Sequence, residues 1–184
     1  MNMTVLALLA ALAAPAAHAV EYRTVLPKQS TIHFEFRQMG VPVKGGFKRF
    51  TTEMMFDPAK PEAARAQIEI DLASIDAGSP EADDESAGRL WFNRSAYPKA
   101  LFVSSQIRAL GNNRYEMRGT LMLKGRSREM VLPVTYTPGK NAATFDGGFV
   151  LKRLDFGIGE GMWADVATVA NEVQVKFRIA TTGN

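Results

Sequence analysis

The chain has 184 residues, of which 22 are Lys or Arg and 19 are Asp or Glu, so its net charge is +3 at neutral pH. It contains no cysteine, which excludes disulfides, thiolate metal sites and a cysteine nucleophile. The charges alternate in sign and form no basic run, so a nucleic-acid partner is not expected. This length is sufficient for one domain with a sizeable apolar core.

The N-terminus is typical of an export signal. The first 20 residues carry no charged side chain, and Val5 to Ala14 form an apolar run that is too short to span a bilayer comfortably. The sequence Ala17-His18-Ala19 then matches a signal-peptide cleavage site. No Lys or Arg precedes the apolar run, and an uncleaved N-terminal helix is the alternative. We predict a signal peptide over residues 1–19 and a periplasmic mature protein over residues 20–184.

Apolar residues recur at every second position through most of the mature chain. In the first such segment Ile32, Phe34 and Phe36 alternate with polar residues, which indicates a strand that is wet on one side and buried on the other. Turn signals such as Gly45-Gly46 and Gly111-Asn112-Asn113 favour antiparallel hairpins. The pattern predicts about eight strands. They lie near residues 32–36, 50–56, 67–72, 101–103, 114–123, 130–136, 145–151 and 173–179.

Strands of this kind hide their apolar faces in a sandwich or in a closed barrel. An eight-stranded barrel has just enough interior for packed side chains or for one slender ligand. Gly119 and Gly147 share the inward parity of large apolar neighbours and would leave room for a ligand. The same residues would equally suit a dry core, and the periodicity fits both interpretations.

Two segments interrupt the strand pattern. Ser79 stands at a helix N-cap position and is followed by Pro80 and several acidic residues, which predicts a short helix over about residues 80–91. The irregular stretch from Gly157 to Val169 is expected to hold a second short helix near residues 162–166.

A series of short motifs runs through the mature chain. In chain order they are Ser30-x-Ile32-x-Phe34, Phe56-Asp57-Pro58, Ala73-Ser74-Ile75, Tyr97-Pro98, Phe102-x-Ser104, Tyr115-x-Met117-x-Gly119-x-Leu121 and Arg153-x-Asp155-Phe156-Gly157. This ordered series resembles the YceI-like family of polyisoprenoid-binding, lipocalin-like periplasmic proteins. The chain departs from the family pattern at Asp83-Asp84, where an Arg-Asp pair is common, and at Asn93, where Asp is common.

The resemblance implies an all-β, eight-stranded antiparallel lipocalin-like barrel, formed by residues 20–184 as a single domain. It also implies an isoprenoid lipid in the lumen, either a polyprenyl phosphate or a ubiquinone-type tail, with no covalent cofactor. The leading hypothesis is a periplasmic carrier of that lipid, in transient contact with the inner membrane or a membrane redox protein. The alternatives are an enzyme acting on an isoprenoid lipid and an accessory subunit that delivers quinone to a membrane redox protein.

The residues expected to line the ligand site share the inward parity of their strands. They are Phe34, Phe36, Ile68, Ile70, Phe102, Met117, Gly119, Leu121, Leu132, Phe149, Arg153, Val175 and Phe177. Arg153 is the one cation among them. It could meet a lipid phosphate or a quinone carbonyl, or it could pair with Asp155 or a buried carbonyl and close the barrel.

Neither a catalytic residue nor a metal site is expected. The only histidine of the predicted mature chain is His33, which has the outward parity of its strand. The chain carries no nucleophile-elbow or P-loop motif. The acidic run at residues 83–85 begins a helix, where it would serve the helix dipole. An enzyme would need titratable groups inside the barrel, and the inward parity supplies only Tyr115, Tyr136 and Arg153.

Overall fold

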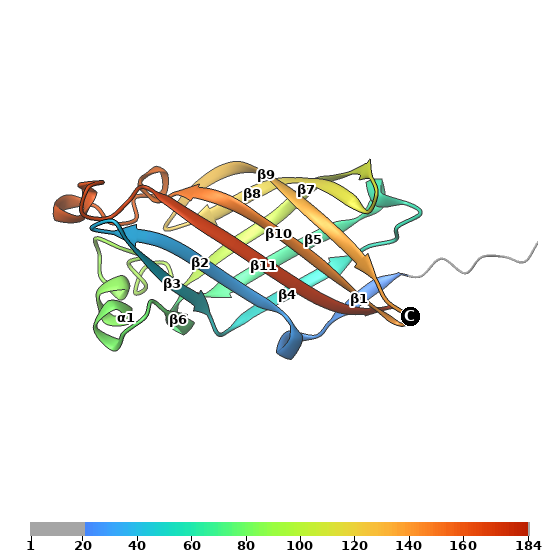
Figure 1. Cartoon of the computed structure of the whole chain (residues 1–184), viewed down its shortest axis with the longest axis horizontal. Helices are drawn as coiled ribbons and strands as arrows, with labels where there is room; N and C mark the ends of the chain where they lie inside the picture. Colours follow the sequence, from blue (N-terminus) through green and yellow to red (C-terminus); the bar gives the residue numbers. More distant parts are fainter. Residues whose placement is uncertain (1–20, 184) are drawn as a thin grey trace, which may run out of the picture.

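The computed structural model describes residues 21–183, and the predicted signal peptide lies outside them. Within this range eleven strands form one sheet with the order β4-β5-β7-β8-β9-β10-β11-β2-β3-β6, and β1 pairs with β11 (Figure 1). Every pairing is antiparallel. The strands are β1 (Tyr22–Val25), β2 (Thr31–Gln38), β3 (Val41–Phe47), β4 (Phe50–Met55), β5 (Arg65–Asp71), β6 (Ile75–Asp76), β7 (Lys99–Gly111), β8 (Arg114–Leu123), β9 (Arg126–Pro138), β10 (Ala142–Lys152) and β11 (Glu172–Gly183).

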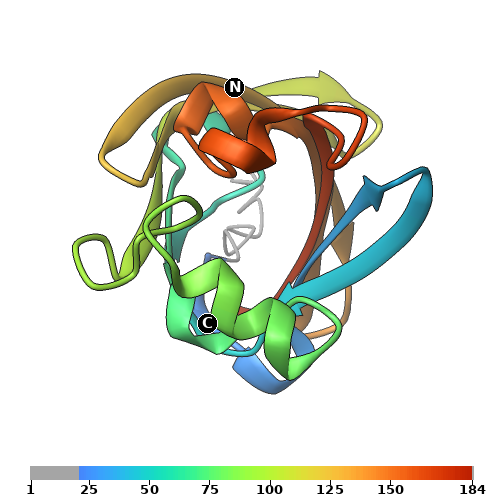
Figure 2. The same ribbon diagram turned by 90° about the vertical axis from the view of Figure 1, so that its left-hand side faces the viewer.

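The sheet curls into a half-barrel (Figure 2), so the predicted closed barrel of eight strands is wrong. The hydrogen-bonded path ends at β4 on one side and at β6 on the other. Between β3 and β4 the chain turns through Lys48 and Arg49. The backbone N–H groups of these two residues donate to the carbonyl oxygen and to Oγ of Ser74, at 3.0 and 2.9 Å. The 3₁₀ turn η3 (Leu72–Ser74) therefore takes hydrogen bonds that direct β3–β4 pairing would use.

The three strands that the sequence did not predict are short or irregular. β1 has four residues and β6 has two, too few to display a period of two. Gly45-Gly46, interpreted as a turn, lies inside β3 opposite Phe34 and His33. The sequence pattern did not predict β3, because two adjacent glycines and Pro42 are uncommon in strands.

The helix α1 (Pro80–Ala87) begins where the sequence predicted, with Ser79 Oγ accepting a hydrogen bond from the backbone N–H of Ala82 at 3.2 Å. It ends at Ala87 and not near Trp91, because Gly88 takes an extended conformation and starts a run of turns. The second predicted helix is a single 3₁₀ turn, η5 (Gly161–Ala164). It follows a similar turn, η4 (Arg153–Phe156).

Aromatic side chains fill the interior at the end of the half-barrel that carries β1. Their ring centroids lie 4.9 to 6.3 Å apart, mostly edge to face. The members of this aromatic plug are Tyr22, Phe56, Tyr115, Tyr136 and Phe145. The buried Tyr136 hydroxyl donates to the Tyr22 hydroxyl at 3.1 Å. The backbone of Tyr22 also exchanges two hydrogen bonds with Phe56, so β1 ties β11 to the end of β4.

Candidate functional site: an apolar cavity at the α1 end

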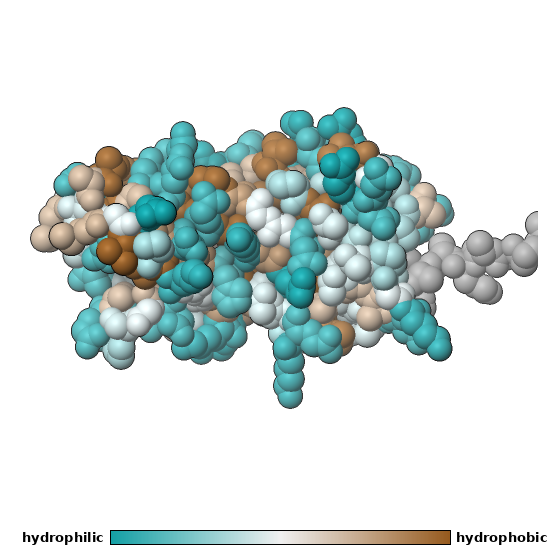
Figure 3. Space-filling model, in the orientation of Figure 1, coloured by the Kyte–Doolittle hydropathy of each residue, from teal (hydrophilic) through white to brown (hydrophobic). Residues whose placement is uncertain are grey.

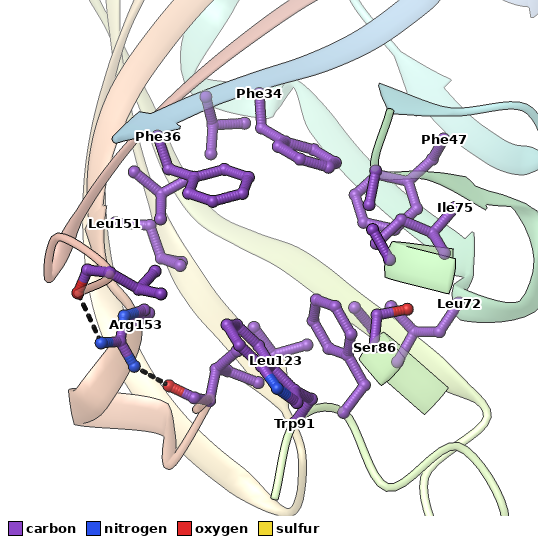
Figure 4. A pocket seen from close by; sticks show the side chains of 18 of the residues that line it. Phe34, Phe36, Phe47, Leu72, Ile75, Ser86, Trp91, Leu123, Leu151 and Arg153 are labelled. Carbon is purple, nitrogen blue, oxygen red and sulfur yellow. Dashed lines mark hydrogen bonds between the residues drawn. The ribbon is translucent and has the colours of Figure 1, made fainter. Parts of the chain in front are cut away.

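A cavity of about 590 Å³ lies on the concave face of the sheet, at the end that carries α1. Its walls come from β2, β3, β5, β7, β8, β10 and β11. Figure 4 shows Phe34, Phe36 and Leu151 projecting into the same space as Trp91 and Leu123. We call this space the outer cavity.

Strand alternation explains why the wall is apolar. On β2 the inward residues Ile32, Phe34 and Phe36 line the outer cavity, whereas His33 is exposed on the opposite face. Phe34 pairs with Val175 of β11, which in turn pairs with Phe149 of β10. Neighbouring strands in register therefore place their apolar side chains at the same level of the cavity.

Seven of the predicted site residues line the outer cavity. They are Phe34, Phe36, Ile70, Leu121, Phe149, Arg153 and Val175. Four others line only a smaller void of about 60 Å³ that continues inward from the outer cavity, and we call this space the inner void. These four are Ile68, Phe102, Leu132 and Phe177. Met117 is buried in the packed core and lines neither space.

Gly119 also lies on neither wall, so it does not face a ligand in either space directly. A Cβ atom at this position would collide with the Val103 carbonyl oxygen and the Phe102 ring. A Cβ atom on Gly147 would likewise collide with the ring of Phe177. Both glycines are instead covered by phenyl rings from a neighbouring strand, an arrangement that compensates for the missing side chain.

Arg153 is held by the backbone. It is 1% exposed, and all five N–H donors of its guanidinium are bonded to carbonyl oxygens 2.6 to 3.0 Å away. The carbonyls belong to Ile158, Gly159, Trp163, Val169 and Ala170. The suggested pairing with Asp155 is absent among the ion pairs of residues 21–183, and the buried-carbonyl alternative is the one observed.

This arrangement gives Arg153 a structural role at the cavity edge (Figure 4). Its five bonds fold the segment 153–170 back over one side of the cavity mouth. Burial lowers the pKa of the guanidinium, which nevertheless remains charged. Because every donor is already used, Arg153 has no free N–H to offer a ligand head group.

The mouth also contains residues that the sequence analysis did not assign to the site. Trp163 of η5 and Glu85 of α1 both line the cavity. The Trp163 Nε1–H group donates to Glu85 Oε1 at 2.9 Å, and the Trp163 ring lies 5.5 Å from that of Trp91. Ser86, on the next position of α1, is buried against the cavity. The available signal was the presence of two tryptophans outside the predicted strands, since aromatic side chains line many ligand pockets.

The two buried tyrosines that the sequence placed on the inward face lie away from the outer cavity. Tyr115 and Tyr136 belong to the aromatic plug, and burial raises the pKa of both phenols. Throughout residues 21–183, no cluster of three or more His, Asp or Glu side chains could hold a metal ion. In the same part of the chain, no helix is long and apolar enough to cross a membrane.

Comparison with known proteins places this fold in a family. Residues 24–181 match the family model of the YceI-like domain. A UPF0312 protein of Pseudomonas syringae pv. tomato is 30% identical over 159 residues, covering 81% of this chain and 82% of that protein. A UPF0312 protein of Azotobacter vinelandii is 30% identical over 134 residues, covering 69% and 70%.

Comparison with solved structures supports the same family and fold. The crystal structure of Burkholderia cenocepacia BcnA matches with a TM-score of 0.84 and 41% identity, covering 86% of this chain and 99% of BcnA. A polyisoprenoid-binding domain from Saccharophagus degradans matches with a TM-score of 0.68 over 91% of this chain and all of that domain. At 16% identity, this second likeness concerns the fold alone. The family suggested by the sequence motifs is thus confirmed, and the chain belongs to the YceI-like domain family.

Proposed function

We propose that the protein is a periplasmic carrier that holds the isoprenoid tail of a lipid in the outer cavity. The observation that carries this proposal is the cavity itself. Its volume of about 590 Å³ falls within the roughly 300–1,000 Å³ of small-molecule sites, and most of its wall is made of aliphatic and aromatic side chains. The description of the Saccharophagus degradans domain as polyisoprenoid-binding points to the same class of ligand.

Apolar burial alone can supply useful affinity. Burying about ten methylene-sized groups contributes roughly 8 kcal/mol, which corresponds to about micromolar binding, before the cost of ordering the chain is subtracted. A prenyl tail has enough carbon atoms to reach this value. It therefore needs few polar contacts from the protein.

The two ends of the half-barrel set the direction of the lipid. The aromatic plug fills one end, and the mouth beside α1 is lined by polar side chains, including Glu81 and Glu85. The tail enters toward the plug and leaves its head group at the mouth. Two carboxylates at the mouth repel a phosphate, and Arg153 has no free donor for one. A neutral head group of the quinone type fits better than a polyprenyl phosphate.

The mouth also carries the side chains that suit contact with a bilayer. Met39 and Met162 are 77% and 76% exposed, more than any other large apolar residue of the part of the chain that the structure describes. Val41, near Met39 in sequence, and Val166, near Met162, are also exposed. The two segments form one surface, because the Met39 backbone N–H donates to the Thr168 carbonyl at 2.8 Å. Tan and brown residues gather at this end in Figure 3, with teal residues between them.

Such a patch commonly marks a membrane or protein contact. We favour the bilayer, because a prenyl lipid resides there and an apolar rim would shield its tail during transfer. Delivery of quinone to a membrane redox protein would use the same cavity, with the patch meeting a protein instead. An enzyme acting on the lipid is disfavoured, since Tyr115 and Tyr136 are held in the aromatic plug.

A matched pair of variants on β10 tests the site. Leu151 lines the outer cavity, whereas its neighbour Val150 is exposed on the other face. Leu151→Trp should fill the cavity and reduce binding of a ubiquinone-type lipid by about tenfold or more, because several buried methylene groups are lost. Val150→Trp should bind as the parent does. Retention of the lipid through gel filtration is the measurement, with melting curves on the same samples. Equal retention by the two folded variants would rule out the outer cavity as the site.

A further inference from the structure

The inner void lies directly below the outer cavity and shares part of its wall. Ile32, Ile70, Ala100, Leu121, Phe149 and Val175 line both spaces. Phe102 and Phe177 line the inner void only. The two spaces are therefore successive levels of one interior, and the two phenyl rings stand at the lower level.

The order of side chains along β10 and β11 defines these levels. On β11, Val173 and Val175 line the outer cavity, Phe177 lines the inner void, and Ile179 belongs to the packed core. On β10, Leu151 and Phe149 line the outer cavity, and Phe145 belongs to the aromatic plug. Between them lies Gly147, opposite Phe177. The level of Phe177 is thus the last one before the interior is filled.

Two glycines hold the rings at this level against the wall. Phe177 lies over Gly147, and Phe102 lies over Gly119 of the adjacent strand β8, so close that a Cβ on either glycine would meet a ring carbon. A phenyl ring that lies along the sheet does not cross the interior. The glycines therefore keep the inner void open, and the bulk of the two rings fixes how large it is.

We propose that Phe102 and Phe177 determine how deep a prenyl tail enters, and hence which tail length the protein prefers. This inference rests on the proposed function. A tail fills the outer cavity first, and its terminal methyl groups reach the inner void between the two rings. A tail longer than this depth must leave carbon atoms exposed at the mouth, where each one contributes little to binding.

The test uses quinones that share one head group and differ only in the number of isoprene units. The measured quantity is the ratio of affinities for long and short tails, which cancels effects common to both. Phe177→Leu enlarges the inner void and should raise this ratio by about tenfold, the effect of about two more buried methylene groups. Ile68→Phe narrows the void from β5 and should lower the ratio by a similar factor.

Val150→Ala is the matched control, because Val150 is exposed on the outer face of β10 and lines neither space. Its ratio should equal that of the parent. An unchanged ratio in both folded Phe177→Leu and folded Ile68→Phe would overturn the inference. If Phe177→Leu does not fold, Ile68→Phe decides alone. Failure of the parent to bind any member of the series would instead overturn the proposed function, so the two failures are distinguishable.

Discussion

Trp163 and Glu85 join the two sides of the cavity mouth. The indole Nε1–H group of Trp163, on η5, donates to Glu85 Oε1, on α1, at 2.9 Å. The segments that they connect are far apart in sequence and are held in place by different parts of the sheet. The hydrogen bond therefore spans the path that a lipid would take.

Loss of this hydrogen bond should make lipid exchange faster. Glu85→Ala removes the acceptor, and a single hydrogen bond of about 1 kcal/mol corresponds to roughly a fivefold change in rate. The measurement is transfer of a ubiquinone-type lipid from the protein to acceptor vesicles. Asp84→Ala, at the preceding position of α1, is the control and should exchange as the parent does. Identical rates for the two variants would contradict a closing role for Glu85.

Arg153 should act on stability rather than on head-group recognition. Arg153→Lys keeps the charge but supplies three donors instead of five, so buried carbonyl oxygens lose their partners. We expect the free energy of unfolding in urea to fall by about 3 kcal/mol or more. Lys152→Gln, at the exposed neighbouring position, should change it little. Loss of lipid binding with unchanged unfolding would contradict this assignment and restore the head-group role.

Met39 and Met162 should govern contact with membranes. Met39→Ser together with Met162→Ser removes the two most exposed large apolar side chains at the mouth. Flotation with phosphatidylcholine vesicles should show association reduced by about tenfold, as expected when two partly buried apolar side chains are lost. The control is Leu110→Ser, at an exposed apolar position next to the β7–β8 turn. Equal loss in the control would show that exposed hydrophobicity in general, and not the mouth, drives association.

The aromatic plug should make the fold sensitive to alkali. Burial raises the pKa of Tyr136, and its hydrogen bond to Tyr22 raises it further. Burial also raises the pKa of Tyr115. A raised pKa in the folded state means that the unfolded chain loses these protons first as the pH increases. The stabilisation is fully present below the ordinary tyrosine pKa of about 10 and is lost above it. The free energy of unfolding should therefore fall above about pH 10.

Tyr136→Phe tests this pH dependence, because it removes one of the titrating groups. The decline in unfolding free energy above about pH 10 should be shallower in this variant than in the parent. Tyr97→Phe changes a tyrosine that is exposed and should leave the decline as it is. A parent whose stability stays constant through this range would contradict the account.

Strand parity predicted the cavity wall well, because the side-chain period of a strand is two and one face of this sheet is buried. Phe34, Phe149 and Val175 were assigned to the interior on this basis, and they line the outer cavity. Parity identifies the face but not what covers it. Parity placed Gly119 on the inward face, but it did not show that the Phe102 ring of the preceding strand β7 lies over this glycine.

The mouth could not be predicted in the same way. Arg153 donates its hydrogen bonds to backbone carbonyl groups. Because every residue carries such a group, the side-chain pattern of the sequence does not identify the partners of Arg153. The sequence also did not predict that the sheet stays open between β3 and β4. This opening depends on hydrogen bonds from the backbone N–H groups of Lys48 and Arg49 to Ser74. The cleavage site after Ala19 remains a prediction, and the intact mass of the exported protein would check it.

The proposed occupant of the interior is an isoprenoid lipid. The most direct measurement is mass spectrometry of the protein purified natively from the periplasm without detergent, followed by analysis of its organic extract. We expect a prenyl-tailed lipid with a neutral, quinone-type head group, bound one per protein and absent from Leu151→Trp. A protein that carries only fatty-acyl lipids, or that retains the same lipid when the cavity is filled, would contradict the account.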